Sequence, residues 1–100
     1  MNRLLISEEA FCDIKDTIEY YSRVSSEKIV NKFRTQLEKG FDYITSRPLS
    51  LELKYKSIRT YQLKQFPYRI HFIYEEGRVM VMGVFHEKSS PKSWEDRLVK

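Results

Sequence analysis

Three polar side chains interrupt the most strand-like stretch of the sequence, PYRIHFIYEEGRVMVMGVFH, and they are the first candidates for chemistry. A guanidinium such as that of Arg69 binds a phosphate through two parallel hydrogen bonds, or stabilises charge that develops in a transition state. An imidazole such as that of His86 titrates near neutral pH and can act as a general acid or base. The structural alternatives are a solvated arginine and a histidine that hydrogen-bonds at a strand end. For His71 a structural or merely exposed role is favoured.

The excess of positive over negative charge lies entirely in the second half of the chain. Residues 1–53 contain 8 Lys and Arg against 9 Asp and Glu, a net of −1, whereas residues 54–100 contain 10 against 5, a net of +5. A one-sided positive field favours an anionic partner, and a basic surface that only maintains solubility is the alternative. The residues predicted to contact such a partner are Lys64, Arg69, His71, Lys88 and Trp94.

Several classes of function lack support in the sequence. No group of His, Cys, Asp and Glu has the spacing of a metal site, and the three glycines are too isolated for a phosphate-binding loop. We therefore expect no metal and no cofactor. The single Cys12 can form no internal disulfide, and no apolar run is long enough for a membrane span or a signal peptide. We expect a cytoplasmic protein with no membrane partner.

The first half of the chain predicts a strand followed by two helices. The run RLLI at residues 3–6 suits a strand, and Ser7 is a predicted N-cap in front of two glutamates. Apolar residues at helical spacing then predict a helix of about 17 residues and, after a two-residue joint, a second of about 20. The second helix must end before Pro48, because the residue preceding proline disfavours the α conformation. Gly40 inside it indicates a close packing contact.

The second half predicts strands. Residues 49–57 have no clean period and are predicted to be a loop. The strands are predicted over residues 58–65, 68–75 and 78–86, and Gly83 in the last indicates a bulge or a close approach. A short helix is predicted to follow, with Pro91 at its first position. One face of the strands is predicted to present Thr60, Gln62, Lys64, Arg69 and His71.

These elements predict an α+β fold in a single domain over residues 1–100. It consists of an N-terminal strand, an αα-hairpin and a three-stranded antiparallel meander, which together form one sheet with the helices on one face. The exposed face of that sheet is then polar and basic. Most aromatic residues fall on the core stripes, and Tyr55 and Trp94 are the two that could instead stack on bases.

The order of elements, together with RLLISEEAFCDIKDTIEYY, the hairpin PYRIHFIYEEGRVMVMGVFH and the segment SSPKSW, resembles the RelE/ParE superfamily of bacterial toxins. The resemblance covers essentially the whole chain and implies a toxin of a type II toxin–antitoxin system with a cognate antitoxin as its partner. RelE-like members are ribosome-dependent endoribonucleases that cut mRNA, whereas ParE-like members poison DNA gyrase. The long helical hairpin and the SSPKSW tail are more similar to the ParE-like members.

The resemblance also implies roles for individual residues. Arg69 stands on the penultimate strand, where the nucleases place a catalytic arginine. His86 stands near the end of the last strand, where some nucleases place a histidine that acts as an acid or base. The loop residues that could supply further catalytic charge are Glu52, Lys54 and Lys56. Several nucleases carry two adjacent basic residues on the last strand and a tyrosine near the C-terminus. This chain lacks both features. A nuclease would need Arg69 and His86 to converge on one solvent-open site together with Glu52 or at least one of the loop lysines, and it would work without a metal.

We therefore expect a ParE-like gyrase inhibitor that plays the part of a plasmid-stabilisation toxin and is not an enzyme. A RelE-like endoribonuclease is the first alternative, and a non-toxic basic binding module is the second.

Overall fold

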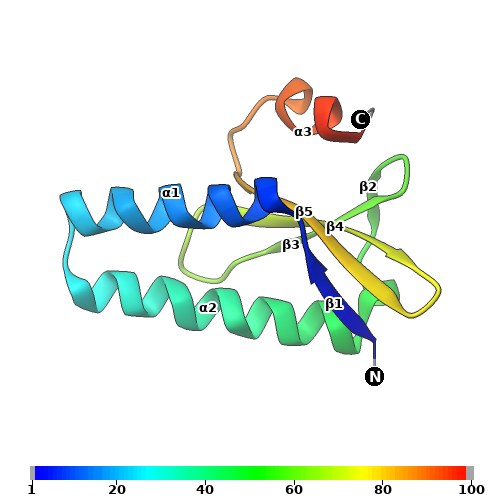
Figure 1. Ribbon diagram of the computed structural model, residues 1–100, viewed down its shortest axis with the longest axis horizontal. Helices are drawn as coiled ribbons and strands as arrows, with labels where there is room; N and C mark the ends of the chain where they lie inside the picture. The colour runs from blue at the N-terminus through cyan, green and yellow to red at the C-terminus, as the bar shows by residue number, and fades with distance from the viewer. Residues whose placement is uncertain (1, 99–100) are drawn as a thin grey trace.

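The computed structural model describes residues 2–98, which form a five-stranded sheet, two long helices and one short helix (Figure 1). The elements in chain order are β1 (Arg3–Ile6), α1 (Glu8–Val24), α2 (Glu27–Ser46), the 3-10 turn η1 (Pro48–Ser50), β2 (Leu53–Tyr55), β3 (Ile58–Gln62), β4 (Tyr68–Glu75), β5 (Arg78–His86) and α3 (Pro91–Leu98). The strands lie in the order β1-β5-β4-β3-β2, with β1 parallel to β5 and all other neighbours antiparallel. The predicted α+β arrangement is confirmed.

The helical hairpin begins and ends where the sequence predicts. Ser7 Oγ accepts a hydrogen bond from the Ala10 amide at 3.1 Å, and Ser26 Oγ accepts one from the Ile29 amide at 3.3 Å. Each cap satisfies a backbone donor that the first turn of a helix leaves unpaired. The second helix ends at Ser46, and Pro48 starts η1. None of the helices in residues 2–98 combines the length and apolar character needed to cross a membrane.

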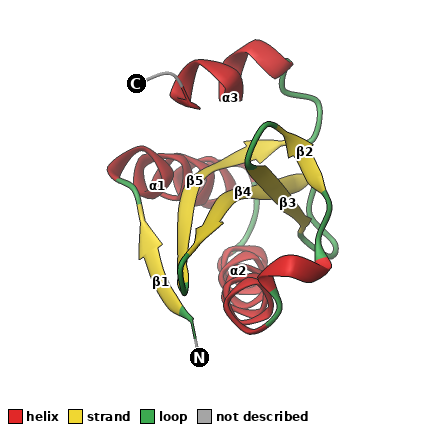
Figure 2. Cartoon of the chain, turned by 90° about the vertical axis from the view of Figure 1, so that its right-hand side faces the viewer, coloured by secondary structure: helices red, strands yellow, loops and turns green. Residues whose placement is uncertain are grey.

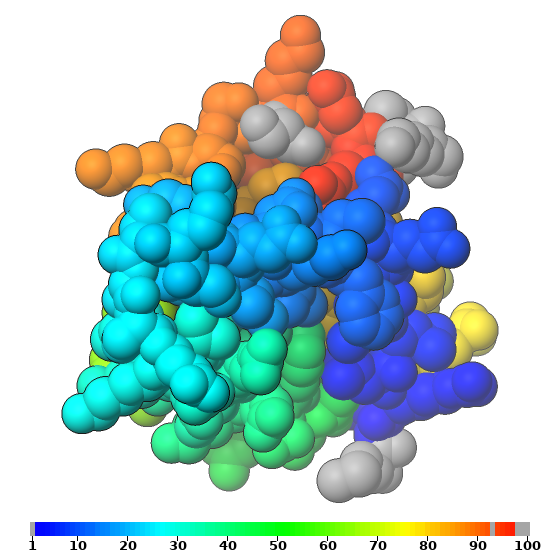
Figure 3. All heavy atoms as spheres, turned by 60° about the vertical axis from the view of Figure 1, so that its left-hand side comes forward, coloured from blue at the N-terminus to red at the C-terminus, as the bar shows by residue number. Residues whose placement is uncertain are grey.

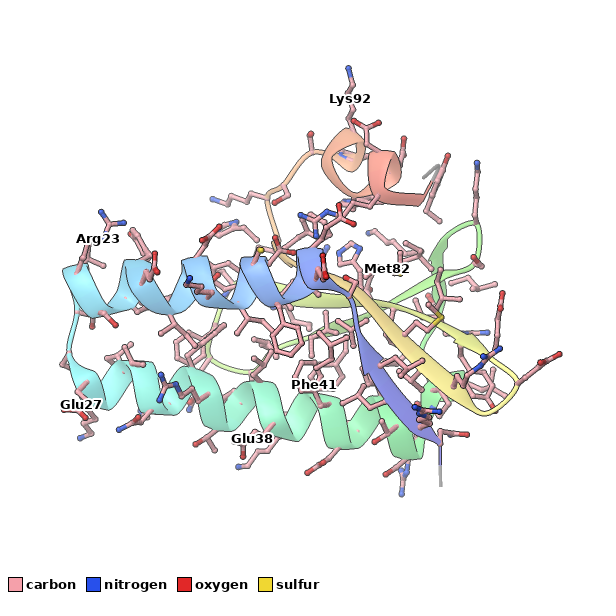
Figure 4. All side chains as sticks on the ribbon, viewed as in Figure 1. Arg23, Glu27, Glu38, Phe41, Met82 and Lys92 are labelled. Atoms are coloured by element: carbon pink, nitrogen blue, oxygen red, sulfur yellow. The ribbon has the colours of Figure 1, made fainter. Side chains whose placement is uncertain are left out.

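The core lies between this hairpin and one face of the sheet. Phe41 points from α2 toward α1 and the sheet, whereas Glu27 and Glu38 point away from the body of the protein (Figure 4). Gly40 lets the helix approach the sheet, because a Cβ at this position would lie 2.8 Å from Ile70 Cδ1. The largest fully buried side chains are Phe33, Phe72, Ile44, Ile58, Ile70, Val79 and Val81.

A bulge divides the central pair of strands, β4 and β5. His71 pairs with Gly83, but Phe72 pairs with Val81, so β5 contributes Met82 as one extra residue at this point. The bulge predicted at Gly83 is confirmed, and so is the close approach, since a Cβ there would lie 2.6 Å from Nη1 of Arg97 in α3.

Two boundaries in the second half differ from the prediction. The segment 49–57, predicted as a loop, contains η1 and the edge strand β2. That strand has only three residues, largely exposed and irregularly paired with β3, so no alternating pattern marks it. The predicted strand 58–65 ends at Gln62, because Leu63 and Phe66 turn inward to join the core and Gln65 adopts a left-handed conformation.

The short helix α3 covers part of the sheet face opposite α2 (Figure 2). Its anchor is Arg97, whose Nη1 and Nη2 donate to the two carboxylate oxygens of Asp13 in α1 at 2.6 and 3.0 Å. The same carboxylate accepts the Val84 amide at 3.0 Å, and Arg97 donates to the Met82 carbonyl at 3.2 Å. The atoms of α3, in orange and red, accordingly lie directly on α1, in blue (Figure 3).

We predict that Asp13→Asn lowers the free energy of unfolding by about 3 kcal/mol, because it removes the carboxylate that binds both Nη groups of the largely sheltered Arg97 guanidinium and leaves the longer ion pair of Arg97 Nε with Glu9, at 3.8 Å. Asp16→Asn is the matched control, since this exposed residue on the same helix changes the net charge equally. Its effect should stay within about 0.5 kcal/mol. Urea unfolding followed by the fluorescence of Trp94 measures both, and equal losses in the two variants would contradict the anchoring role.

Candidate functional site

The candidate site is a hollow of about 380 Å³ at the corner of the sheet face opposite the long helices. It lies between the segment that leads from η1 into β2 and the neighbouring strands β3 and β4. Its lining residues are Ser50, Leu51, Glu52, Leu53, Lys54, Thr60 and Arg69. The structure therefore brings together three of the sequence-predicted residues, Glu52, Lys54 and Arg69.

Arg69 is held at this hollow by a hydrogen bond from its Nε to Gln62 Oε1, at 3.0 Å. Gln62 lies opposite Arg69 in the register of β3 and β4, so the two side chains share one face of the sheet. Within residues 2–98, no carboxylate comes within ion-pair distance of the Arg69 guanidinium. Because Arg69 lines the hollow, its two Nη groups can donate to an anion that enters it.

His71 also lies on this face, but it is only 3% exposed, which corrects the prediction that the face presents it to solvent. The rings of Phe85 and Trp94 cover it, with centroid separations of 4.9 and 5.5 Å. Its buried Nδ1 has no hydrogen-bond partner among the described residues. Burial, followed by the positive charges of Arg69 and other basic side chains, lowers the pKa of His71 to about 4, so the ring is neutral at physiological pH.

His86 lies on the opposite face of the sheet from Arg69. It pairs with Tyr68 while Arg69 pairs with Phe85, and adjacent residues of a strand point to opposite faces. The His86 ring packs against Tyr68 with a centroid separation of 5.4 Å, and its Nδ1 accepts the Lys88 amide at 3.0 Å. Together with Tyr20, Tyr21 and Pro67, these two rings line a separate hollow of about 310 Å³. Arg69 and His86 do not converge.

The remaining sequence-predicted residues are dispersed. Lys56 occupies the turn between β2 and β3, where its Nζ lies 5.3 Å from the centre of the Tyr55 ring. Lys64 is exposed in the turn after β3, and Lys88 is exposed beyond the end of β5. Trp94 is 8% exposed and packs on Tyr55 and His71, so it belongs to a small second core under α3.

The sequence places Thr60 and Gln62 on this face without assigning either a role, and it does not identify Asp13 and Arg97 as a pair. The spacing of Gln62 and Arg69 across a short turn is the signal that could have identified the first contact. No local signal marks the second, because the two residues lie 84 positions apart. Within residues 2–98, no three His, Cys, Asp or Glu side chains gather as a metal site would require.

No family model and no curated protein matches this sequence. Solved structures do match it. A chain from the chromosomal ParDE toxin–antitoxin system of P. aeruginosa superposes with a TM-score of 0.76 over 86% of this chain and 96% of that chain, at 12% identity. The chain has the RelE/ParE toxin fold. The isolated E. coli RelE toxin superposes with a TM-score of 0.56 over 96% of this chain and 95% of its own, at 15% identity. The RelE/ParE fold of this chain therefore superposes better on the ParDE chain than on RelE.

We predict that His71 makes this RelE/ParE fold sensitive to acid. A histidine whose pKa is lower in the folded state is protonated first in the unfolded state, so stability is complete above pH 6.5 and falls as the pH drops toward 4. The loss attributable to His71 is about 3 kcal/mol at pH 4 relative to pH 7. Urea unfolding at several pH values should show that His71→Gln removes this part of the slope. His86→Gln is the control and should retain it, and an unchanged slope in His71→Gln would contradict the assignment.

Proposed function

We propose that this protein is the toxin of a type II toxin–antitoxin system and that it stops growth by poisoning DNA gyrase. The observation that carries the proposal is the superposition on the ParDE chain, which extends over 96% of that chain. The superposition on the RelE toxin has a lower TM-score over a larger part of this chain, which supports the same choice.

The geometry of the sheet also favours gyrase over a nuclease activity. A nuclease that used Arg69 and His86 would need both groups within reach of one phosphate, because proton transfer requires hydrogen-bond distances. The two side chains lie on opposite faces of the sheet, and α3 covers His71, the other imidazole. Under this proposal Arg69 and His86 contribute to folding or to partner binding rather than to catalysis.

The proposed partner is a cognate antitoxin. The net charge of +5 over residues 54–100 favours an acidic protein segment through electrostatic attraction. Lys64 and Lys88 are exposed and available for such a contact, together with Arg69. The protein is proposed to act in the cytoplasm, where a single cysteine stays reduced. It needs neither a metal nor a cofactor for this function.

A ribosome-dependent mRNA endoribonuclease is the second candidate, and the hollow itself supports it. Glu52, Lys54 and Arg69 line one space, where the cations could hold a phosphate and the carboxylate could move a proton. A nuclease site in this hollow would use neither His86 nor Lys56. A non-toxic basic binding module remains the third candidate, and it predicts no effect on growth.

Controlled expression in a bacterial cell separates these candidates. We predict that the wild-type chain arrests growth with DNA breaks and a damage response, and that Arg69→Ala/His86→Ala does the same, because neither residue takes part in the reaction. Translation and DNA integrity are recorded together after induction. Circular dichroism of the purified double variant controls for folding.

Two results would contradict the gyrase proposal. Early arrest of translation with cleaved mRNA, lost in Arg69→Ala/His86→Ala, would establish the nuclease. Normal growth of cells that contain the folded wild-type protein would establish the non-toxic module.

A further inference from the structure

Gln62 has a contact pattern that the proposed function does not explain. Its Nε2 lies 3.1 Å from the carbonyl oxygens of both Phe66 and Tyr68, and 3.3 Å from that of Leu63. Carbonyl oxygens only accept hydrogen bonds, so the amide nitrogen must face the turn and the amide oxygen must face away from it. That oxygen, Oε1, accepts a hydrogen bond from Nε of Arg69, and the two atoms are 3.0 Å apart. The turn backbone therefore orients Gln62, and Gln62 orients Arg69.

This arrangement determines which edge of the guanidinium is available. With Nε engaged, the two Nη groups remain as a planar pair of donors directed away from Gln62. Such a pair matches the two oxygens of a carboxylate, and a guanidinium already held in place loses less side-chain entropy on binding. The Thr60 hydroxyl and the Lys54 ammonium line the same hollow and supply further donors.

The shape of the surface favours the end of a side chain over a nucleic-acid strand. The segment from Ser50 to Lys54 borders the hollow on one side. On the neighbouring part of the sheet, Trp94 covers His71, so the backbone of a strand could not continue across the face. Leu53 at the rim is 56% exposed and offers an apolar surface beside the guanidinium.

We propose that Gln62 and Arg69 form a preorganised site for a carboxylate side chain of a partner peptide, with an apolar residue next to the acid packing on Leu53. Arg69 binds the carboxylate, and Gln62 is a positioning residue. The identity of the partner as an acidic antitoxin rests on the proposed function, whereas the chemistry of the site does not.

The test follows the Nε–Hε resonance of Arg69 in the full-length protein labelled with ¹⁵N-arginine. The probes are the capped tripeptides Leu-Glu-Leu and Leu-Gln-Leu and, separately, inorganic phosphate at matched ionic strength. We expect a saturable shift with the Glu peptide and an affinity about tenfold above that for the Gln peptide, as one charge-assisted interaction supplies.

Substitutions then test the two residues separately. Gln62→Met keeps the length of the side chain, but it cannot donate to the turn and its sulfur is only a weak acceptor. It should therefore weaken binding of the Glu peptide about tenfold and speed exchange of the Arg69 Hε with water. Arg69→Lys has no guanidinium resonance, so its binding is followed by the backbone amide resonances of β3 and β4 in uniformly ¹⁵N-labelled protein. It keeps the charge without the planar fork and should lower the preference for Glu over Gln. Gln65→Met, at an exposed position in the same turn, is the control and should bind as the wild type does.

Equal affinities for the Glu and Gln peptides, or phosphate binding more tightly than the Glu peptide, would overturn the carboxylate site. Unchanged binding and exchange in Gln62→Met would overturn the positioning role. Should Gln62→Met not fold, the comparison of Arg69→Lys with the wild type still decides the carboxylate site, and Gln62→Asn replaces it for positioning. Growth arrest is measured independently, so a wild-type chain that binds no Glu peptide but still arrests growth refutes only this site and leaves the proposed function intact.

Discussion

The ion pair between Asp13 and Arg97 is the constraint on which the arrangement of the two sheet faces depends. β1 pairs with β5 only as far as Val81. Beyond that residue, the backbone N–H and C=O groups on this edge of β5 have no neighbouring strand to pair with. Asp13 accepts the Val84 amide and Arg97 donates to the Met82 carbonyl, so the pair completes the edge next to the bulge. By doing so it also holds α3 over His71, whereas the corner at Arg69 stays open.

Local signals were sufficient for most of the fold and insufficient for the second core. The cap at Ser7 and the stop at Pro48 located the two ends of the helical hairpin, because each acts within one helical turn. The alternation over residues 68–75 located β4 for a similar reason. The short strand β2 has too few residues to show a period. The burial of His71 depends on a contact between α1 and α3, which no local pattern encodes.

The candidate site shows how one residue of register decides chemistry. Arg69 and His86 are both plausible from their residue types, yet Arg69 pairs with Phe85 and His86 pairs with Tyr68, so the two point to opposite faces. Sequence alone placed Gln62 on the face of Arg69 but could not reveal that the turn after β3 fixes its amide. The two solved structures share the RelE/ParE fold with this chain at 12% and 15% identity, and a shared fold does not by itself determine function.

The most direct test of the central claim is a supercoiling assay with purified DNA gyrase, run with the wild-type chain and with Arg69→Ala. The account predicts that both proteins inhibit supercoiling and cause cleaved DNA to accumulate, because the target surface does not involve the Arg69 hollow. Gyrase that keeps full activity, while the wild-type chain cleaves ribosome-bound mRNA and Arg69→Ala does not, would contradict it.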